Sequence, residues 1–203
     1  SLYLKRLKPH ARANTVKLMH RWIPTNSLLH SQGRSESDIC PRCKTAPETA
    51  EHIYSCADPG ACQERTTLLY NALSDMEQAE MPSFVLHTME QHLTMTLNLD
   101  SRQQYNIRQE LTPTEQTSLC NAVHHQTLLG WHSFLCGYIS NFWNKLAFRT
   151  RTTKKQYWES KLTSVSLNLH KTIWEGRNCH VHGANVKEAK QRAREAIITK
   201  IKK

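Results

Sequence analysis

The segment from Cys40 to Cys56 constrains this chain more than any other, because it has the ligand spacing of a metal-binding knuckle. It follows the pattern Cys-x2-Cys-x8-His-x3-Cys, with candidate ligands at Cys40, Cys43, His52 and Cys56. Zn²⁺ takes four tetrahedral ligands from thiolate and imidazole groups, and a site in which the protein fills all four positions is structural rather than catalytic. The sequence therefore predicts one structural zinc ion bound by these residues.

The local sequence suits a zinc knuckle, although other interpretations exist. Residues 48–56 can form a short helix that places His52 and Cys56 on one face. The cysteines could instead be free thiols. A thioredoxin-like redox pair is less well supported, since no strand–helix–strand pattern surrounds them. Cys62 rivals Cys56 as the fourth ligand, but a turn at residues 58–60 separates it from His52.

Composition and charge restrict the class of partner. Of the 203 residues, 38% are hydrophobic and 22% are charged, and the formal net charge is +10 at pH 7. These values indicate a globular protein with a polyanionic partner, although a basic surface can also serve solubility alone. No apolar run approaches the about 18 residues that suggest a membrane span, and we recognise no signal peptide. We therefore expect no membrane association.

The cysteines indicate the cellular compartment. Their number, seven, is odd, and the predicted metal site uses three of them. Cys120, Cys136 and Cys179 lie in helical patterns, where we expect buried thiols. Disulfides belong to oxidising compartments, so we expect an intracellular protein, cytoplasmic and/or nuclear.

Helical periodicity predicts an all-α protein, in which a small zinc-knuckle module is followed by a multi-helix C-terminal domain. Thr112 and Glu115 form a capping-box pattern at the start of a long helical segment, which glycines interrupt near residues 130 and 137. We expect the aromatic side chains of residues 131–148 to form core rather than a base-stacking platform. The predicted apolar helix faces are Val16, Met19 and Ile23; Leu69, Leu73 and Met76; and Leu86, Met89, Leu93 and Leu97.

The chain divides into three predicted parts. Residues 1–62 contain a basic helix and the zinc-binding module, and residues 63–111 form a helical connector. Residues 112–203 form a helical C-terminal domain that ends in a basic helix.

Residues 12–62 resemble a known family. Arg21-Trp22, Pro24 and Leu28-Leu29, followed by the cysteine and histidine block, are similar to the zinc-binding region downstream of the polymerase domain in non-LTR retrotransposon reverse transcriptases. A weaker similarity to the tails of such proteins lies in Gly130-Trp131, Phe134-Leu135, Gly137, Ile139-Ser140 and Trp143, and in Trp174, Arg177-Asn178 and His182-Gly183. The resemblance implies a C-terminal segment that holds template RNA or target DNA, with the rest of the reverse transcriptase as its partner.

The chain lacks the carboxylate pair that a polymerase needs. Two-metal catalysis requires neighbouring carboxylates, whereas the aspartates here are isolated, at positions 38, 58, 75 and 100. We therefore expect a non-catalytic segment whose basic residues contact phosphate groups. The candidates are Lys5, Arg6, Lys8, Arg12, Lys17 and Arg21 in the first helix; Arg42 and Lys44 in the knuckle; and Arg149, Arg151, Lys154 and Lys155 in a later basic run.

Two alternative functions remain open. Arg177 and His182 have the Arg-x4-His spacing found in HEPN-type ribonucleases, in which the histidine takes part in cleavage and the arginine contacts phosphate. The structural interpretation is that both residues pack at the end of a long helix and have no catalytic role. The other alternative is a protein-interaction scaffold, with the helical domain as its docking surface.

Overall fold

The structure is a computed structural model that describes residues 8–99, 111–149 and 158–201. Within these ranges it is helical, which confirms the predicted all-α class, and the β structure there is one isolated antiparallel bridge between Ile39 and Pro47. The helices are α2 (Pro9–Met19), α3 (Asn26–Ser31), α4 (Ala50–Ser55), α5 (Pro59–Gln78), α6 (Ser83–Thr96), α7 (Pro113–Leu129), α8 (Trp131–Leu135), α9 (Phe142–Arg149), α10 (Trp158–His182) and α11 (Val186–Ile201).

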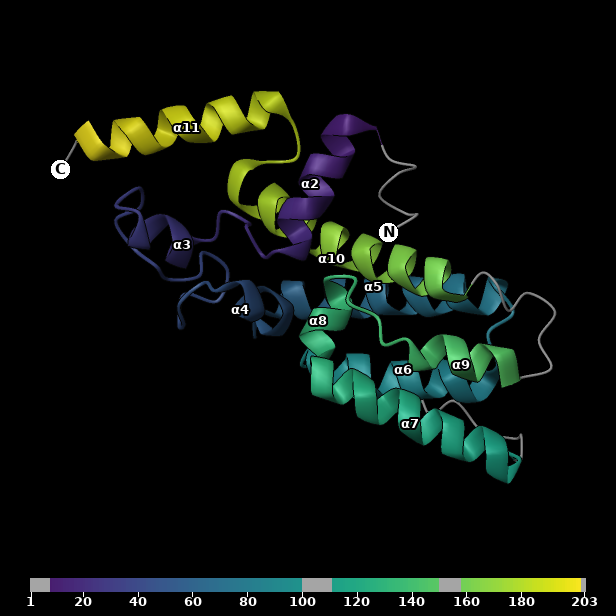
Figure 1. Cartoon of the computed structure of the whole chain (residues 1–203). Coiled ribbons are helices and arrows are strands. Elements are labelled where there is room, and N and C mark those ends of the chain that lie inside the picture. Colours follow the sequence, from purple (N-terminus) through teal and green to yellow (C-terminus); the bar gives the residue numbers. More distant parts are fainter. Residues whose placement is uncertain (1–7, 100–110, 150–157, 202–203) are drawn as a thin grey trace.

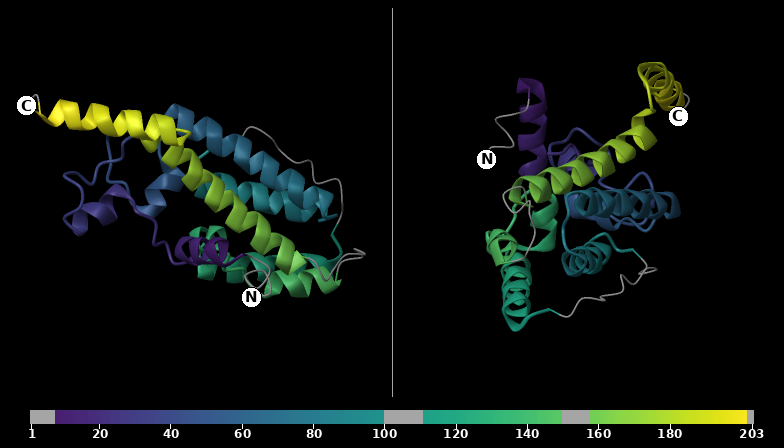
Figure 2. Two further views of the ribbon diagram at one scale, coloured as in Figure 1. Left: turned by 90° about the horizontal axis from the view of Figure 1, so that it is seen from above. Right: turned by 90° about the vertical axis from the view of Figure 1, so that its right-hand side faces the viewer.

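Helix α10 is the element around which the others are arranged (Figure 1). It packs against α5 and α2, and also contacts α4, α8 and α9. Helix α6 packs on α5, and α7, which packs on α9, lies below α6 in the view of Figure 1. Helix α11 follows α10 and extends away from the helical body (Figure 2). None of the helices in the described ranges is both long and apolar enough to cross a membrane.

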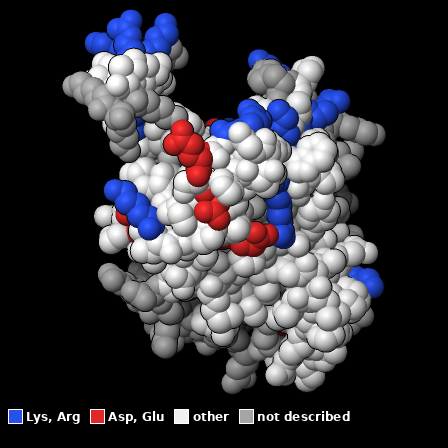
Figure 3. All heavy atoms as spheres, turned by 90° about the vertical axis from the view of Figure 1, so that its left-hand side faces the viewer, with Lys and Arg blue, Asp and Glu red and all other residues white. Residues whose placement is uncertain are grey.

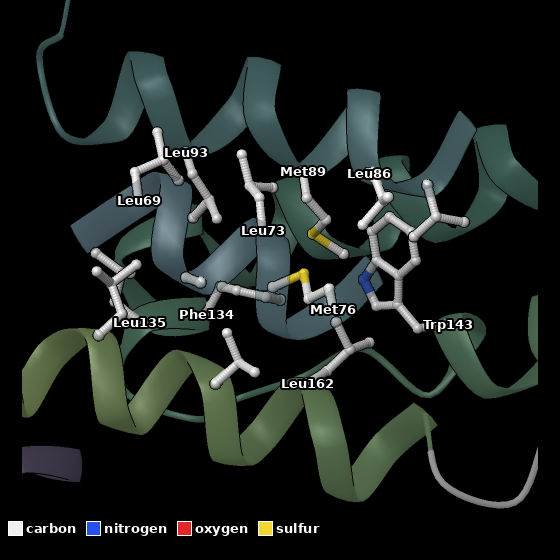
Figure 4. Close-up of a cluster of buried hydrophobic side chains, with 14 of the residues drawn as sticks. Leu69, Leu73, Met76, Leu86, Met89, Leu93, Phe134, Leu135, Trp143 and Leu162 are labelled. Carbon is white, nitrogen blue, oxygen red and sulfur yellow. The ribbon is translucent and has the colours of Figure 1, made fainter. Parts of the chain in front are cut away.

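One hydrophobic core contains residues from all three predicted parts of the chain. Side chains of α5, α6, α8, α9 and α10 meet at its centre (Figure 4). The predicted faces on α5 and α6 are confirmed, since each of their residues is at most 3% exposed. Leu18, Ile53, Trp143 and Ile173 belong to the same core, so the metal-binding segment packs on the body of the protein.

The predicted apolar face of the first helix is wrong. Val16 is exposed, whereas Leu18 and Ile23 are buried. Helix α2 ends at Met19, so Ile23 lies in the following turn and not on the helix face. The reason is a strong helix stop, which periodicity alone does not reveal.

This helix stop is a Schellman motif. The backbone N–H of Trp22 donates to the carbonyl of Lys17 at 2.8 Å, and that of Arg21 donates to the carbonyl of Leu18 at 3.0 Å. Arg21 has φ = 55°, a left-handed conformation that usually favours glycine. The chain therefore turns sharply at Arg21 and directs Trp22 and Ile23 toward α10.

Other local predictions are confirmed, with one exception. The capping box at the start of α7 forms, and Gly130 and Gly137, with φ of 86° and 82°, flank the short helix α8. Of the three cysteines expected to be buried, Cys136 is buried, but Cys120 and Cys179 are exposed. They lie on the sides of α7 and α10 that face away from the core.

Candidate metal centre and basic surface

The structure brings the four predicted metal ligands together. The ligand atoms of Cys40, Cys43, His52 and Cys56 all lie within 4.8 Å of one another. The sulfur atoms of Cys40 and Cys56 are 3.8 Å apart, and the sulfur of Cys43 is 3.3 Å from Nε2 of His52. Two sulfurs bound tetrahedrally to zinc at about 2.3 Å lie about 3.8 Å apart. The four residues therefore form a metal site with dimensions compatible with zinc.

Local backbone structure places these ligands. The N–H of Cys40 donates to the carbonyl of Ala46, and the N–H of Lys44 donates to that of Cys40, which folds the first two cysteines into one turn. Lys44 has φ = 60° in this turn. Thr49 caps α4 by accepting a hydrogen bond from the N–H of His52 at 3.0 Å.

The fourth ligand lies just beyond α4. Helix α4 ends at Ser55, one residue earlier than the helix predicted from the sequence, and Cys56 is its C-cap with ψ = 127°. His52 and Cys56 still reach the same site. The rival ligand Cys62 lies outside the cluster, and its thiol faces the carbonyl of Cys56 at 3.5 Å.

The thiols of the site differ in acidity. Burial raises the pKa of the Cys40 thiol to about 12, so a nearby cation is needed to keep it ionised at neutral pH. Burial also raises the pKa of the Cys43 thiol, but hydrogen bonds from the side chain and backbone of Thr45 outweigh this effect and lower it to about 6. The donor set therefore suits a metal that stabilises thiolates.

A buried arginine contacts the site, and we did not predict it from the sequence. Arg65 of α5 is 2% exposed. Its Nη2 donates to the carbonyl of Cys56 at 2.7 Å and to the sulfur of Cys62 at 3.3 Å, while its Nε donates to the carbonyl of Leu97 at 3.2 Å. A zinc ion bound here by three thiolates and one neutral imidazole would carry a net charge of about −1, and the charge of Arg65 would offset it.

The position of Arg65 in the sequence indicates that its side chain is buried. It lies four residues before Leu69 and therefore on the apolar face of α5. A charged residue at a core position requires buried hydrogen-bond partners. In this chain those partners are the carbonyl of the candidate ligand Cys56, the sulfur of Cys62 and the carbonyl of Leu97.

A second buried arginine connects the metal-binding segment to α10. Arg177 donates through Nε to Oε1 of Glu48 at 2.8 Å and through Nη2 to Oε2 at 2.5 Å. Glu48 is completely buried and Arg177 is 4% exposed. Oε2 of Glu48 also accepts a hydrogen bond from the N–H of Asn26 at the start of α3. This pair joins α3, the knuckle and α10.

The ribonuclease alternative depends on the same arginine. For Arg177 to contact an RNA phosphate, its guanidinium would have to leave Glu48 and become exposed. The distances and burial therefore favour the packing interpretation of the Arg177 and His182 pattern. Partial desolvation, together with the charge of Arg177, lowers the pKa of His182, which is an exposed residue at the end of α10.

The predicted phosphate-contacting residues fall into different environments. Lys8, Arg12 and Lys17 are exposed on α2, and Lys44 is exposed on the knuckle. Arg21 forms an ion pair with Glu51 of α4. Arg42 forms two hydrogen bonds of 2.8 Å with the carboxylate of Glu64, and its Nε lies 3.4 Å from Asp58. Arg149 ends α9, while Lys5, Arg6, Arg151, Lys154 and Lys155 lie outside the described residues.

The basic side chains of the described residues gather in separate groups. Figure 3 shows lysines and arginines over α11 and over α2, with acidic side chains between the two groups. Within α2, from Pro9 to Met19, there is no acidic residue. Helix α2 itself therefore supplies no acidic side chain to offset its positive charge. Arg21 and Arg42 form ion pairs with carboxylates of other segments.

Comparison of the chain with protein-family models, with curated proteins and with solved structures finds no match.

Proposed function

We propose that this chain is a zinc-stabilised nucleic-acid-binding segment. In this proposal it is the non-catalytic C-terminal part of a retroelement reverse transcriptase, and it holds template RNA or target DNA for the rest of that enzyme. The metal ion is zinc, held by the three cysteines and the histidine in a structural role. The reduced thiols that such a site needs favour an intracellular compartment.

The observation that carries the proposal is the set of exposed basic residues on and next to α2. Arg12 and Lys17 on α2 and Lys8 at its N-cap are exposed, the helix contains no acid, and the net charge of the chain is +10. Surface cations of this kind bind phosphate groups and release counterions from the nucleic acid. The resemblance of residues 12–62 to the zinc-binding region of reverse transcriptases agrees with this role.

The metal centre has a defined part in this proposal, because it supports the end of α2. Arg21 follows α2 and pairs with Glu51, which is the residue before the candidate ligand His52. A structural zinc contributes directly to the folding free energy of such a segment. Metal binding would thus fix α4, and α4 would hold the turn that ends α2.

Salt dependence of binding tests the proposal. We would measure the affinity of the full chain for fluorescent RNA and DNA, as single strands and as duplexes, at several salt concentrations. In the triple variant Lys8→Glu, Arg12→Glu, Lys17→Glu we expect weaker binding to every sequence. We also expect the slope of log K against log salt to fall by about one unit for each lost phosphate contact.

A matched control uses the same number of reversals on α11. Lys187, Lys190 and Arg194 are exposed there, far along the chain from the metal centre. We expect the control triple variant to lose less affinity than the α2 variant. Unchanged affinity and slope in the α2 variant, with zinc still bound, would contradict the proposed function.

One observation favours a scaffold role for part of the chain. The last turns of α11 expose Ile197, Ile198 and Ile201, which are 58%, 51% and 78% exposed. Apolar residues that cluster on a helix surface commonly contact another protein. We propose that this end of α11 contacts the rest of the parent protein. Substitution of the three isoleucines by serine should leave nucleic-acid affinity unchanged and abolish that contact in a pull-down with the parent polymerase domain.

A further inference from the structure

A groove lies between α2 and α10, and the exposed Lys17 of α2 is one of its lining residues. Its volume is about 610 Å³, which is within the range of about 300–1,000 Å³ that is common for ligand sites. The buried residues Leu18 and Ile23 belong to its apolar lining. The groove is therefore large enough for a ligand and partly apolar.

An exposed tryptophan lines this groove. Trp22 is 73% exposed, more than any other tryptophan in the chain that the structure describes. Tryptophan side chains are usually largely buried. The Schellman turn at Arg21 fixes its backbone. Trp174 of α10 also lines the groove, and the guanidinium of Arg177 lies 5.0 Å from the centre of its ring. The groove thus contains one covered and one uncovered aromatic ring.

The polar residues of the groove suit a base attached to a phosphate chain. Lys17 and Lys171 line it, and its acid, Glu175, lies 3.6 Å from Lys171 in an exposed ion pair. Within the described part of the chain, the side-chain amides of Asn14 and Asn168 have no hydrogen-bond partner, and both line the groove. Asparagine amides donate to and accept from the edges of bases, while exposed aromatic rings stack on their faces.

We infer that this groove binds an unpaired base of a single-stranded nucleic acid, with Trp22 as the stacking platform. Lys17 and Lys171 contact the flanking phosphates, and Asn14 and Asn168 face the base edge. A duplex does not bind in the same way, because the faces of its bases are covered by neighbouring base pairs. The inference rests on the proposed function and narrows it from nucleic acid in general to single strands.

The charge of the groove favours nucleic acid over a protein segment as its occupant. An apolar peptide would cover Trp22, Leu18 and Ile23, but it would offer no anionic partner to the two lysines and would not need the two amides. An anionic strand uses the lysines, the amides and the indole together. The experiment must therefore distinguish a groove that binds nucleic acid from one that binds a protein segment.

The test compares single-stranded and duplex binding by the full chain. The probes are a labelled oligouridylate of about 12 nucleotides, which suits the site sizes of single-strand grooves, and an RNA duplex of equal length. Trp22→Ala should lower affinity for the oligouridylate about tenfold or more, while affinity for the duplex stays within about twofold. Trp22→Phe should retain most of the single-strand affinity, since a phenyl ring still stacks.

The controls separate this inference from the proposed function. Tyr138→Ala removes another exposed aromatic ring, 42% exposed, and should leave both affinities unchanged. Oligouridylate should also quench the tryptophan fluorescence of the wild-type protein, and the quenching should be smaller in Trp22→Phe. Zinc content and the circular dichroism spectrum of each variant confirm that it is folded.

Two results would overturn the inference. Trp22→Ala with unchanged oligouridylate affinity, while Lys17→Glu weakens binding, would mean that nucleic acid binds elsewhere on α2 and that Trp22 serves a protein contact. Equal losses for oligouridylate and duplex would also overturn it, because stacking on an unpaired base could not cause both. In either case the proposed function stands. It fails separately if the α2 charge reversals have no effect.

Discussion

The carboxylate of Glu48 and the guanidinium of Arg177 form a buried, two-pronged ion pair across a separation of 129 residues. Glu48 directly precedes the cap of α4, and Arg177 lies on α10, so the pair fixes the metal-binding segment to the longest helix of the structure. A bidentate arginine–carboxylate pair also sets the orientation of both side chains. The knuckle is therefore a part of the helical body and not a tethered finger.

Breaking this pair from one side should destabilise the protein strongly. In Arg177→Met the carboxylate of Glu48 stays buried without its partner, and we expect the free energy of unfolding to fall by about 3–5 kcal/mol. The double variant Glu48→Gln, Arg177→Met should recover part of this loss, because the uncompensated charge is gone. Urea denaturation measures the free energy of unfolding of the wild type, the single variant and the double variant. The exposed pair Lys171–Glu175 on the same helix is the control, and Lys171→Met should cost less than about 1 kcal/mol. A small loss in Arg177→Met would mean that the pair is unimportant for stability.

Removing one ligand should release the metal. We expect about one zinc per purified wild-type chain and much less in Cys43→Ser, together with loss of structure around residues 39–56, because a tetrahedral site needs all four ligands. Cys62→Ser is the matched control, since Cys62 lies outside the cluster, and it should keep its zinc. Mass spectrometry of the native protein reports the metal directly. Full zinc content in the double variant Cys43→Ser, His52→Ala would refute the assignment of the ligands.

Arg65 should determine how tightly the metal is held. Arg65→Met removes the cation beside the thiolates and the hydrogen bond to the carbonyl of Cys56, and we expect zinc affinity to fall about 10- to 100-fold. Competition with a chromogenic chelator gives this affinity. Arg65→Lys keeps the charge but not the set of hydrogen bonds, so its zinc affinity should lie between those of the wild type and Arg65→Met. Equal zinc affinity in all three proteins would show that Arg65 serves packing alone.

His170 should make the protein sensitive to acid. Its side chain is 1% exposed and packs edge-on against Tyr54, and burial, with a smaller effect from the charge of Arg21, lowers its pKa to about 4. The unfolded chain binds this proton at about pH 6.5, so the unfolded state gains protons first as the pH falls. Above about pH 6.5 the titration of His170 does not reduce the free energy of unfolding. Between about pH 6.5 and 4 it lowers the free energy of unfolding by about 3 kcal/mol in total.

The variant His170→Phe isolates this effect. It keeps an aromatic ring against Tyr54 but cannot take up a proton, so its free energy of unfolding should fall less than that of the wild type between pH 6.5 and 4. Acid also protonates the metal ligands, but that loss is common to both proteins and cancels in the difference. Parallel curves for the two proteins would contradict the assignment.

Truncation after Gly183 should separate α11 from the rest of the molecule. Helix α11 packs mainly on the end of α10 and contributes no residue to the hydrophobic core of the described chain. We expect the truncated chain to keep its zinc and its midpoint of thermal unfolding within a few degrees. Its nucleic-acid affinity should fall less than that of the α2 charge-reversal variant. A larger loss would identify α11 as the main contact with the nucleic acid.

The parts of the structure that depend on short stretches of sequence were predictable. The ligand spacing from Cys40 to Cys56 identified the residues that the structure brings together, and the capping box at Thr112 identified the start of α7. Both features involve residues that are close in the chain. The apolar faces of α5 and α6 were predictable for the same reason, since a stripe at helical spacing is a local property.

The contacts that depend on distant residues were not predictable. Nothing in the sequence near Glu48 indicates that its partner is Arg177, because pair formation follows from how α10 crosses the knuckle. The face of α2 was predicted wrongly, since the left-handed residue that ends the helix is an arginine and not a glycine. The exposure of Trp22 was missed too, because a tryptophan is most often buried.

The conformation of Arg21 gives this residue two separate tasks. Its backbone turns the chain so that Trp22 lines the groove, and its side chain holds Glu51 on the helix that carries His52. The candidate metal site and the groove are therefore structurally connected through a single residue. If metal binding pre-organises the groove, then by reciprocity a strand bound in the groove must raise the affinity of the knuckle for its metal by the same factor. A chain engaged on nucleic acid would resist chelation longer than a free one, so each ligand protects the other.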